Sequence, residues 1–268
     1  MSQTLNIFFV GDVMGKPGLQ MVEKLLKQYL QKYEVDFCIV NGENTTDGKG
    51  VSEEDAKTLF GLGVHVITTG NHLWDRWQSR ALLAKEKNIL RPLNYPRENG
   101  GQGFVVYDLK EKGQVGVINL QGRTFMQPID DPFKAADWAL SKIINSTKVV
   151  FIDMHAEASA EKMALAWYLD GRVSALVGTH THVPTADARI LPNGTAFITD
   201  VGMSGPYDSV IGMKKEVAVK RFLLQTPHKF EIAANDVHLC AVFVQVDRDT
   251  GKALKIEQVI FPDFETER

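Results

Sequence analysis

The sequence predicts an α/β protein in which mixed sheets lie between layers of helices. Short apolar runs typical of buried strands alternate with amphipathic helical segments along much of the chain. Paired strands joined by tight turns are expected over 103–120 and 237–260. Parallel strands from the alternating segments and antiparallel strands from the hairpins together predict mixed sheets, and 268 residues are enough to bury one large core.

Three strand–helix units are expected at the start of the chain. Strands are expected over 5–10, 35–40 and 64–69, with helices over 17–33, from Ser52 to about residue 61, and over 73–87. The segment 17–33 has an apolar stripe at helical spacing and charged residues on its other face. Ser52, with Asp55 three residues later, is close to the capping-box pattern that marks a helix start.

The second half of the chain continues the pattern, with a hairpin at 103–120 that breaks the strict alternation. The other expected elements are helices over 132–144, 159–170 and 214–224, strands over 148–154, 173–177 and 195–199, and the closing hairpin over 237–260. The sequence has no internal repeat, linker or low-complexity tract. We therefore expect one compact domain.

Composition and charge narrow the possible partners. The formal net charge of −3 does not provide the broad basic surface that binds long nucleic acid through its phosphates. Residues 1–5 lack the basic start and apolar core of a signal peptide, and no apolar run has the length of a membrane span, so we expect a cytoplasmic protein without membrane partners. Cys38 lies in an apolar run and is expected to be a buried thiol.

Polar side chains that can bind metal follow five of the predicted strands. They are Asp12, Glu43, Asn44, Asn71, His72, His155, His180 and His182. Because strand ends in α/β sheets converge on one edge, these side chains can line a single cleft. Carboxylate, amide and imidazole ligands without thiolate suit a divalent ion such as manganese, iron, zinc or nickel. The ligands are too many for one ion, and a shared carboxylate would allow two ions about 3.5–4 Å apart.

The chain resembles the calcineurin-like metallophosphoesterases in five ordered blocks, and within them the YmdB-like bacterial branch of 2',3'-cyclic-nucleotide phosphodiesterases. The blocks are Gly11-Asp12, Asn41-Gly42-Glu43-Asn44, Gly70-Asn71-His72, Met154-His155-Ala156-Glu157 and Gly178-Thr179-His180-Thr181-His182. Each block is common by chance, but five in order at strand ends are specific. The resemblance implies a four-layer αββα sandwich of mixed sheets, formed by a single domain over 1–268 with small cap elements within 73–145.

The resemblance also implies a role for each position. One metal ion would be held by Asp12, Glu43, Asn44 and His182, and the other by Glu43, Asn71, His155 and His180, with Glu43 as the bridge. A hydroxide that bridges the two ions would attack phosphorus, and His72 would be the general acid that protonates the leaving oxygen. The implied substrates are 2',3'-cyclic and also 3',5'-cyclic nucleotides. Iron or manganese is the implied metal, and the implied assembly is a homo-oligomer, either a dimer or a tetramer.

Two positions depart from the wider superfamily. Met14 stands where most members have a histidine ligand, and Glu43 stands where they have a bridging aspartate. The YmdB-like branch shares both changes, which favours that branch over generic phosphatases and nucleases. Two alternatives stay open: a phosphomonoesterase or nuclease acting on short RNA ends, and a regulatory nucleotide-binding protein with a metal site.

The residues that would contact a nucleobase are less clearly marked in the sequence. The aromatic candidates for stacking are Trp74, Tyr95, Phe125 and Tyr207, and packing in the core is the alternative for each. Glu157 and Asp200 also lie at strand ends, where they are candidates to orient metal-binding histidines.

Overall fold

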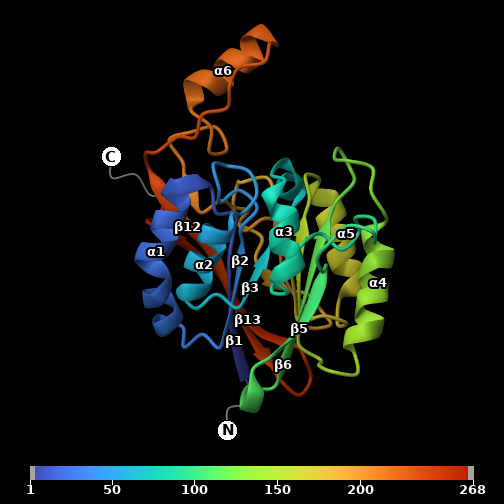
Figure 1. The fold of residues 1–268 in the computed structure, drawn as a ribbon. Helices are drawn as coiled ribbons and strands as arrows, with labels where there is room; N and C mark the ends of the chain where they lie inside the picture. Colours follow the sequence, from blue (N-terminus) through green and yellow to red (C-terminus); the bar gives the residue numbers. More distant parts are fainter. Residues whose placement is uncertain (1–3, 265–268) are drawn as a thin grey trace.

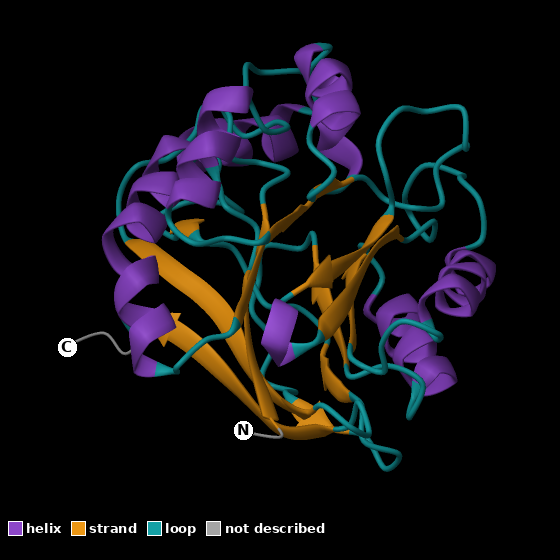
Figure 2. Cartoon of the chain, turned by 60° about the horizontal axis from the view of Figure 1, so that its bottom comes forward, coloured by secondary structure: helices purple, strands orange, loops and turns teal. Residues whose placement is uncertain are grey.

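Two β-sheets packed face to face, with helices outside each of them, form the core of the computed structural model, which describes residues 4–264 (Figures 1 and 2). The layer between the sheets is apolar and draws side chains from both, as in the stacked rings of Phe9 and Phe151, whose centroids lie 5.5 Å apart. This arrangement confirms the predicted α/β class and the four-layer αββα sandwich.

The first sheet combines parallel and antiparallel strands. Its order is β11-β12-β1-β2-β3-β4, with β13 paired to the free side of β12. The strands are β1 (Thr4–Val10), β2 (Phe37–Asn41), β3 (Val66–Thr68), β4 (Ile89–Leu90), β11 (Gly205–Pro206), β12 (Val237–Asp247) and β13 (Ala253–Phe261). Strands β1 to β4 are parallel, while β12 runs antiparallel to β1. The carboxyl ends of β1, β2 and β3 therefore lie side by side.

The second sheet has the order β5-β6-β7-β8-β10-β9. Its strands are β5 (Phe104–Asp108), β6 (Gln114–Gln121), β7 (Val150–His155), β8 (Ala175–Thr179), β9 (Arg189–Ile190) and β10 (Ala196–Ile198). Strands β6, β7, β8 and β10 are parallel, and the predicted β5–β6 hairpin is present. The carboxyl ends of β6, β7 and β8 are thus adjacent as well.

Helices cover the outer face of each sheet. The first sheet packs against α1 (Gly15–Lys32), α2 (Glu53–Gly61) and α3 (Gln78–Lys85), and the second against α4 (Pro132–Ile143) and α5 (Ser159–Leu169). The predicted apolar stripe of α1 is buried at Val22, Leu25 and Leu26. Helix α6 (Lys215–Leu224) projects from the body of the molecule (Figure 1).

The prediction of one helix over 73–87 is wrong. The chain forms a short 3-10 helix, η1 (Asn71–Asp75), and then α3, with Arg76 extended between them at φ −116° and ψ 121°. The Arg76 guanidinium donates hydrogen bonds to the carbonyl oxygens of Lys49 at 2.6 Å and Thr46 at 3.0 Å. These tertiary bonds to the loop after β2 accompany a break that local helical periodicity did not reveal.

The predicted start of α2 is confirmed, because the Ser52 hydroxyl accepts a hydrogen bond from the Asp55 amide at 3.1 Å. Cys38 is buried, as expected, and burial raises the pKa of its thiol. Strands β4, β9 and β11 were not predicted. Each has only two residues, too few to show an alternating pattern.

Within residues 4–264, no helix is long and apolar enough to cross a membrane. The expectation that no signal peptide is present concerns residues 1–5, of which residues 1–3 lie outside the described part of the chain. The cytoplasmic location and the single domain with cap elements within 73–145 stay predictions.

Candidate metal centre

The predicted site residues all lie at or just after the carboxyl ends of parallel strands, on one edge of the sandwich. Asp12 follows β1, Glu43 and Asn44 follow β2, Asn71 and His72 begin η1 after β3, His155 ends β7, and His180 and His182 follow β8. The two sheets thus contribute residues to the same edge of the sandwich, as the sequence predicted.

His155 Nε2 is the point where one set of predicted ligands meets. It lies 3.0 Å from Glu43 Oε1, 3.1 Å from Asn71 Oδ1 and 3.1 Å from His180 Nδ1. His155 and Glu43 are buried, and ligand atoms of Glu43, His155 and His180 all lie within 4.8 Å of one another. These four side chains are those expected to hold the second ion.

The other predicted set is joined by fewer contacts. Asn44 Oδ1 lies 3.2 Å from His182 Nε2, and His182 Nδ1 lies 2.9 Å from the carbonyl oxygen of Ile211. Asp12 is fully buried between the two sets: its Oδ2 accepts a hydrogen bond from the His180 amide at 3.2 Å, and its Oδ1 is 3.8 Å from His155 Nδ1. The structure therefore brings all the predicted ligands to one place, while their individual roles stay a prediction.

The donor set fits metal ions. His155 Nε2 faces three polar atoms at about hydrogen-bond distance, although an imidazole nitrogen has either one proton or one lone pair to share. Asp12 Oδ1 is a buried carboxylate oxygen without a hydrogen-bond partner among the described residues. Because a buried unpaired carboxylate is costly, a bound cation explains both observations. Asn71 Oδ1 and Asn44 Oδ1 add neutral oxygen ligands.

The electrostatics agree with a cation site. Burial alone would raise the pKa of Glu43, but the charge of His155 and its hydrogen bond outweigh burial and lower that pKa to about 2. Burial likewise opposes the charge of His155, yet Glu43 and then Asp12 raise the pKa of His155 to about 9. Burial and the nearby His155 lower the pKa of His180 to about 3. A positive charge on His155 thus compensates the negative charge of Glu43. A bound metal cation would provide the same compensation.

A buried network below the centre orients His155, and the sequence analysis missed it. His155 Nδ1 lies 2.9 Å from Thr179 Oγ1, and Thr179 Oγ1 in turn donates to Asp153 at 2.7 Å. Asp153 also accepts from Asn41 and Thr68. Burial raises the pKa of Asp153 to about 6. The signal in the sequence was a carboxylate inside an apolar strand, two residues before His155 and hence on the same face of β7.

The loop carrying His180 and His182 has a strained backbone, with φ of 100° and 64° at these two residues. Asp200 supports the residue between them: its Oδ2 accepts from the Thr181 hydroxyl at 2.8 Å and from the Thr181 amide at 3.2 Å. The same carboxylate forms a fully buried ion pair of 2.7 Å with Lys162. Asp200 thus acts on the loop through Thr181, whereas Glu157 Oε2 contacts His180 Nε2 directly at 3.2 Å.

Two glycines are required by the close packing at the centre. A Cβ atom on Gly70 would lie 2.2 Å from a ring carbon of His155 and 2.3 Å from Glu43 Oε2. A Cβ atom on Gly178 would lie 1.7 Å from the backbone oxygen of Thr199. The predicted blocks that begin at Gly70 and Gly178 therefore start with glycine because no side chain fits at these two positions.

His72 differs from the other histidines in its surroundings. Its side chain is about one-third exposed, and its Nδ1 lies 3.0 Å from Asp75 Oδ2. Its backbone amide donates to Glu43 Oε2 at 3.1 Å. Burial opposes the charge of Asp75, but hydrogen bonds from His72 and Lys49 outweigh it and lower the pKa of Asp75. Asp75 thus contacts the His72 ring at Nδ1, while the His72 backbone holds Glu43.

The four aromatic stacking candidates have different environments. Tyr95 is buried, and its ring lies 5.5 Å from that of Trp74. The hydroxyl of Tyr207 is hydrogen-bonded to the backbone of Met203. Trp74, Tyr95 and Tyr207 thus pack against other residues, in agreement with the core-packing alternative. That alternative is wrong for Phe125, which is 88% exposed.

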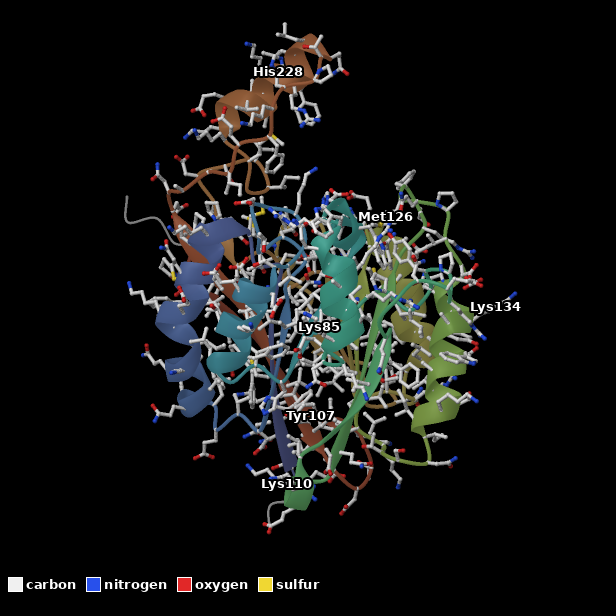
Figure 3. The ribbon with its side chains drawn as sticks, viewed as in Figure 1. Lys85, Tyr107, Lys110, Met126, Lys134 and His228 are labelled. Atoms are coloured by element: carbon white, nitrogen blue, oxygen red, sulfur yellow. The ribbon has the colours of Figure 1, made fainter. Side chains whose placement is uncertain are left out.

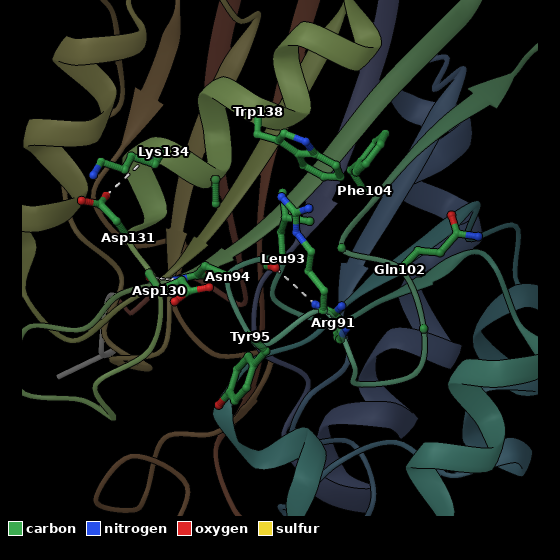
Figure 4. Close-up of a pocket in the computed structure, with 14 residues that line it drawn as sticks. Arg91, Leu93, Asn94, Tyr95, Gln102, Phe104, Asp130, Asp131, Lys134 and Trp138 are labelled. Atoms are coloured by element: carbon green, nitrogen blue, oxygen red, sulfur yellow. Dashed lines mark hydrogen bonds between the residues drawn. The ribbon is translucent and has the colours of Figure 1, made fainter.

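A cavity of about 680 Å³ lies between the segment 91–104 and α4. Figure 4 shows the residues that line it. Its walls include Tyr95, Trp138 and the buried Arg91. The Arg91 guanidinium already donates hydrogen bonds to the carbonyl oxygens of Pro92 at 2.9 Å and Leu93 at 3.2 Å. We therefore assign no ligand to this cavity.

Comparison with known proteins agrees with the five blocks. The family model described as YmdB-like protein matches residues 8–259. The chain belongs to the YmdB-like family. A Bacillus subtilis member named 2',3'-cyclic-nucleotide 2'-phosphodiesterase is 46% identical over 97% of this chain and 98% of its own length.

Two solved structures share the fold at substantial sequence identity. A hypothetical protein from Thermus thermophilus superposes with a TM-score of 0.89 at 41% identity, covering 96% of this chain and 99% of the other. A Mycoplasma pneumoniae protein described as a novel phosphatase superposes with a TM-score of 0.92 at 38% identity, covering 97% and 94%. These relatives confirm the predicted family and the predicted enzyme class, a hydrolase of phosphoric esters.

Proposed function

We propose that this YmdB-like protein hydrolyses 2',3'-cyclic nucleotides to nucleoside monophosphates, with 3',5'-cyclic nucleotides as a second substrate class. The observation that carries the proposal is the convergence of Glu43, Asn71 and His180 on His155 Nε2, beside His72, whose backbone amide donates to Glu43 Oε2. The name of the Bacillus subtilis relative supports the choice of a cyclic diester.

The donor set leads us to propose two metal ions, either iron or manganese. One ion would be held by Asp12, Glu43, Asn44 and His182, and the other by Glu43, Asn71, His155 and His180. Imidazole, carboxylate and amide ligands without thiolate suit these metals. When bound, such ions supply Lewis acidity to the phosphoryl oxygens and make water a stronger nucleophile.

The residues around the cleft supply the proton that hydrolysis requires. Water oxygen forms a new bond to phosphorus, the bond from phosphorus to one ribose oxygen breaks, and that leaving oxygen needs a proton. His72 would provide it: its Nδ1 lies 3.0 Å from Asp75 Oδ2, so the proton that it transfers would be the one on Nε2. Asp75 is thus a positioning residue for His72.

Turnover of matched substrates tests this proposal. Metal-loaded protein is incubated with 2',3'-cyclic AMP, 3',5'-cyclic AMP, adenosine 3'-monophosphate and a short RNA with a phosphorylated end, and products are separated by chromatography. The proposal expects the 2',3'-cyclic diester to be hydrolysed fastest. Preference for the monoester or the RNA end would favour the phosphomonoesterase or nuclease alternative, and binding without turnover would favour a regulatory nucleotide-binding protein.

We also propose that the protein forms a homo-oligomer through α6. Val219, Phe222, Leu223 and Leu224 on this projecting helix are between 51% and 77% exposed. At roughly 150–250 Å² for an aromatic side chain and somewhat less for aliphatic ones, two such patches covering each other would bury about 900 Å² of apolar surface. With the surrounding polar rim, this area reaches the range of specific interfaces, about 1,200 Å².

A twofold pairing needs no apolar patch elsewhere on the molecule, because the same helix serves both copies. Light scattering with size separation measures the mass of the wild type and of Phe222→Glu. We expect a dimer or larger for the wild type and a smaller species for the variant. A monomeric wild type, or a variant of unchanged mass, would contradict this interface.

A further inference from the structure

The loop after β6 presents an aromatic side chain to solvent. Phe125 is 88% exposed, and its backbone φ of 61° lies in the left-handed region that bulky residues rarely adopt. The loop begins at Gln121, the residue that pairs with His155 across β6 and β7. A strained backbone that exposes a large apolar ring, on a loop that starts beside a predicted metal ligand, is a signal of function.

The loop is held in place at both ends. The amides of Arg123 and Thr124 donate to the carboxylate of Glu161 on α5 at 3.1–3.2 Å. At its other end, Gln127 Oε1 lies 3.3 Å from the Tyr95 hydroxyl oxygen. Met126, the neighbour of Phe125, lies at the edge of the molecule where the carboxyl ends of the strands meet (Figure 3). Phe125 therefore sits on a loop that is anchored on both sides of it and that begins beside the end of β7.

A buried hydrogen-bond donor without a partner lies at the start of the loop. Gln121 is fully buried, and its Oε1 accepts from the Tyr95 hydroxyl at 3.0 Å, while its Nε2 has no partner among the described residues. Unpaired buried donors are costly, so a ligand with acceptor atoms would stabilise this region.

We propose that Phe125 stacks on the base of the nucleotide, on the loop that leads away from the buried Gln121. The unpaired Gln121 Nε2 would donate to an oxygen or nitrogen acceptor of the nucleoside. This inference rests on the proposed function and deepens it, because it assigns a nucleoside subsite next to the phosphate site. Every base can stack on an aromatic ring. Purines would be favoured only because their larger rings offer more surface for stacking.

Binding of a base-containing and a base-free ligand separates this contact from the metal site. Calorimetry on metal-loaded protein measures the affinity for adenosine 3'-monophosphate and for glycerol 2-phosphate, which has the phosphate but no base. The variants are Phe125→Ala and Phe125→Trp. The control is Trp167→Ala, which removes another exposed aromatic side chain, 53% exposed, near the end of α5.

The expected result is a selective loss. Phe125→Ala should weaken adenosine 3'-monophosphate binding by about tenfold, a typical effect of one stacking contact, and leave glycerol 2-phosphate unchanged. Phe125→Trp should keep the affinity, and Trp167→Ala should change neither ligand. If Phe125→Ala binds the nucleotide within twofold of the wild type, or loses both ligands equally, the assignment is overturned.

A parallel turnover assay distinguishes the failure of this inference from the failure of the proposed function. The substrates are 2',3'-cyclic AMP and glycerol 1,2-cyclic phosphate, which share the reacting five-membered ring. A wild type that hydrolyses neither diester contradicts the proposed function, while the binding data still decide the role of Phe125. A different outcome is that the wild type hydrolyses both diesters and that Phe125→Ala lowers kcat/KM equally for both. That outcome contradicts base stacking by Phe125 and leaves the proposed function standing.

Discussion

The buried ion pair of Lys162 and Asp200 yields a quantitative prediction about the loop that carries two of the predicted ligands. Both side chains are fully buried, and the Nζ–Oδ2 distance is 2.7 Å. Lys162→Met keeps the apolar stem and removes the charge, which leaves the Asp200 carboxylate buried without its counter-ion. Breaking a buried pair in this way costs about 3–5 kcal/mol.

The remaining hydrogen bonds of Asp200 place the expected loss of stability at the lower end of that range. Asp200 keeps hydrogen bonds from the Thr181 hydroxyl, the Thr181 amide and the Gly202 amide. We therefore expect a loss of about 3 kcal/mol, and at about 2 °C per kcal/mol for a chain of this length, a Tm lower by about 6 °C. Metal affinity should also fall, because Asp200 holds Thr181, and Thr181 lies between the predicted ligands His180 and His182.

Thermal unfolding followed by circular dichroism, together with metal titration, measures both effects. The matched control is Lys214→Met, which breaks the exposed ion pair with Glu231 and should leave the Tm nearly unchanged, because solvent screens an exposed pair. If the Tm of Lys162→Met stays within about 2 °C of the wild type, the argument that this pair supports the loop is refuted.

Three further predictions follow from the centre. His72→Ala should retain metal and lose about 10²–10⁴-fold in kcat, and an unchanged rate would rule out the acid role. Gly178→Ala should fail to give soluble protein of native Tm, because its Cβ would meet the Thr199 carbonyl, whereas Gly61→Ala should be tolerated in open space. Chelation should lower the Tm reversibly, because it leaves buried carboxylates without a cation; equal unfolding curves with and without chelator would argue against bound metal.

The positions of the site residues were predictable because each follows a recognisable apolar strand. The pattern places Asp12, Glu43 and His155 at strand ends, and the general behaviour of parallel sheets brings such ends together. The same reasoning predicted the mixed sheets between helical layers once the hairpins were recognised. Local sequence was sufficient where a single strand and its exit loop determined the geometry.

The contacts that refine the site could not be predicted in this way. Asp153 and Thr179 support His155 across neighbouring strands, and their partnership depends on the register between β7 and β8. The break at Arg76 follows from bonds to a loop about 30 residues earlier in the chain. Phe125 looks like a core residue by composition, and only the path of its loop exposes it.

Metal content and turnover, measured on one preparation, test the central claim most directly. Wild type, Glu43→Ala and the control Glu53→Ala, which alters an exposed glutamate on α2, are purified without chelator and checked for folding by circular dichroism. Each sample is then analysed for metal and for hydrolysis of 2',3'-cyclic AMP. We expect two ions per chain and hydrolysis in the wild type and in Glu53→Ala, and the loss of both in folded Glu43→Ala. A Glu43→Ala protein that keeps its metal and its turnover would contradict the shared-ligand role of Glu43 and with it the proposed centre.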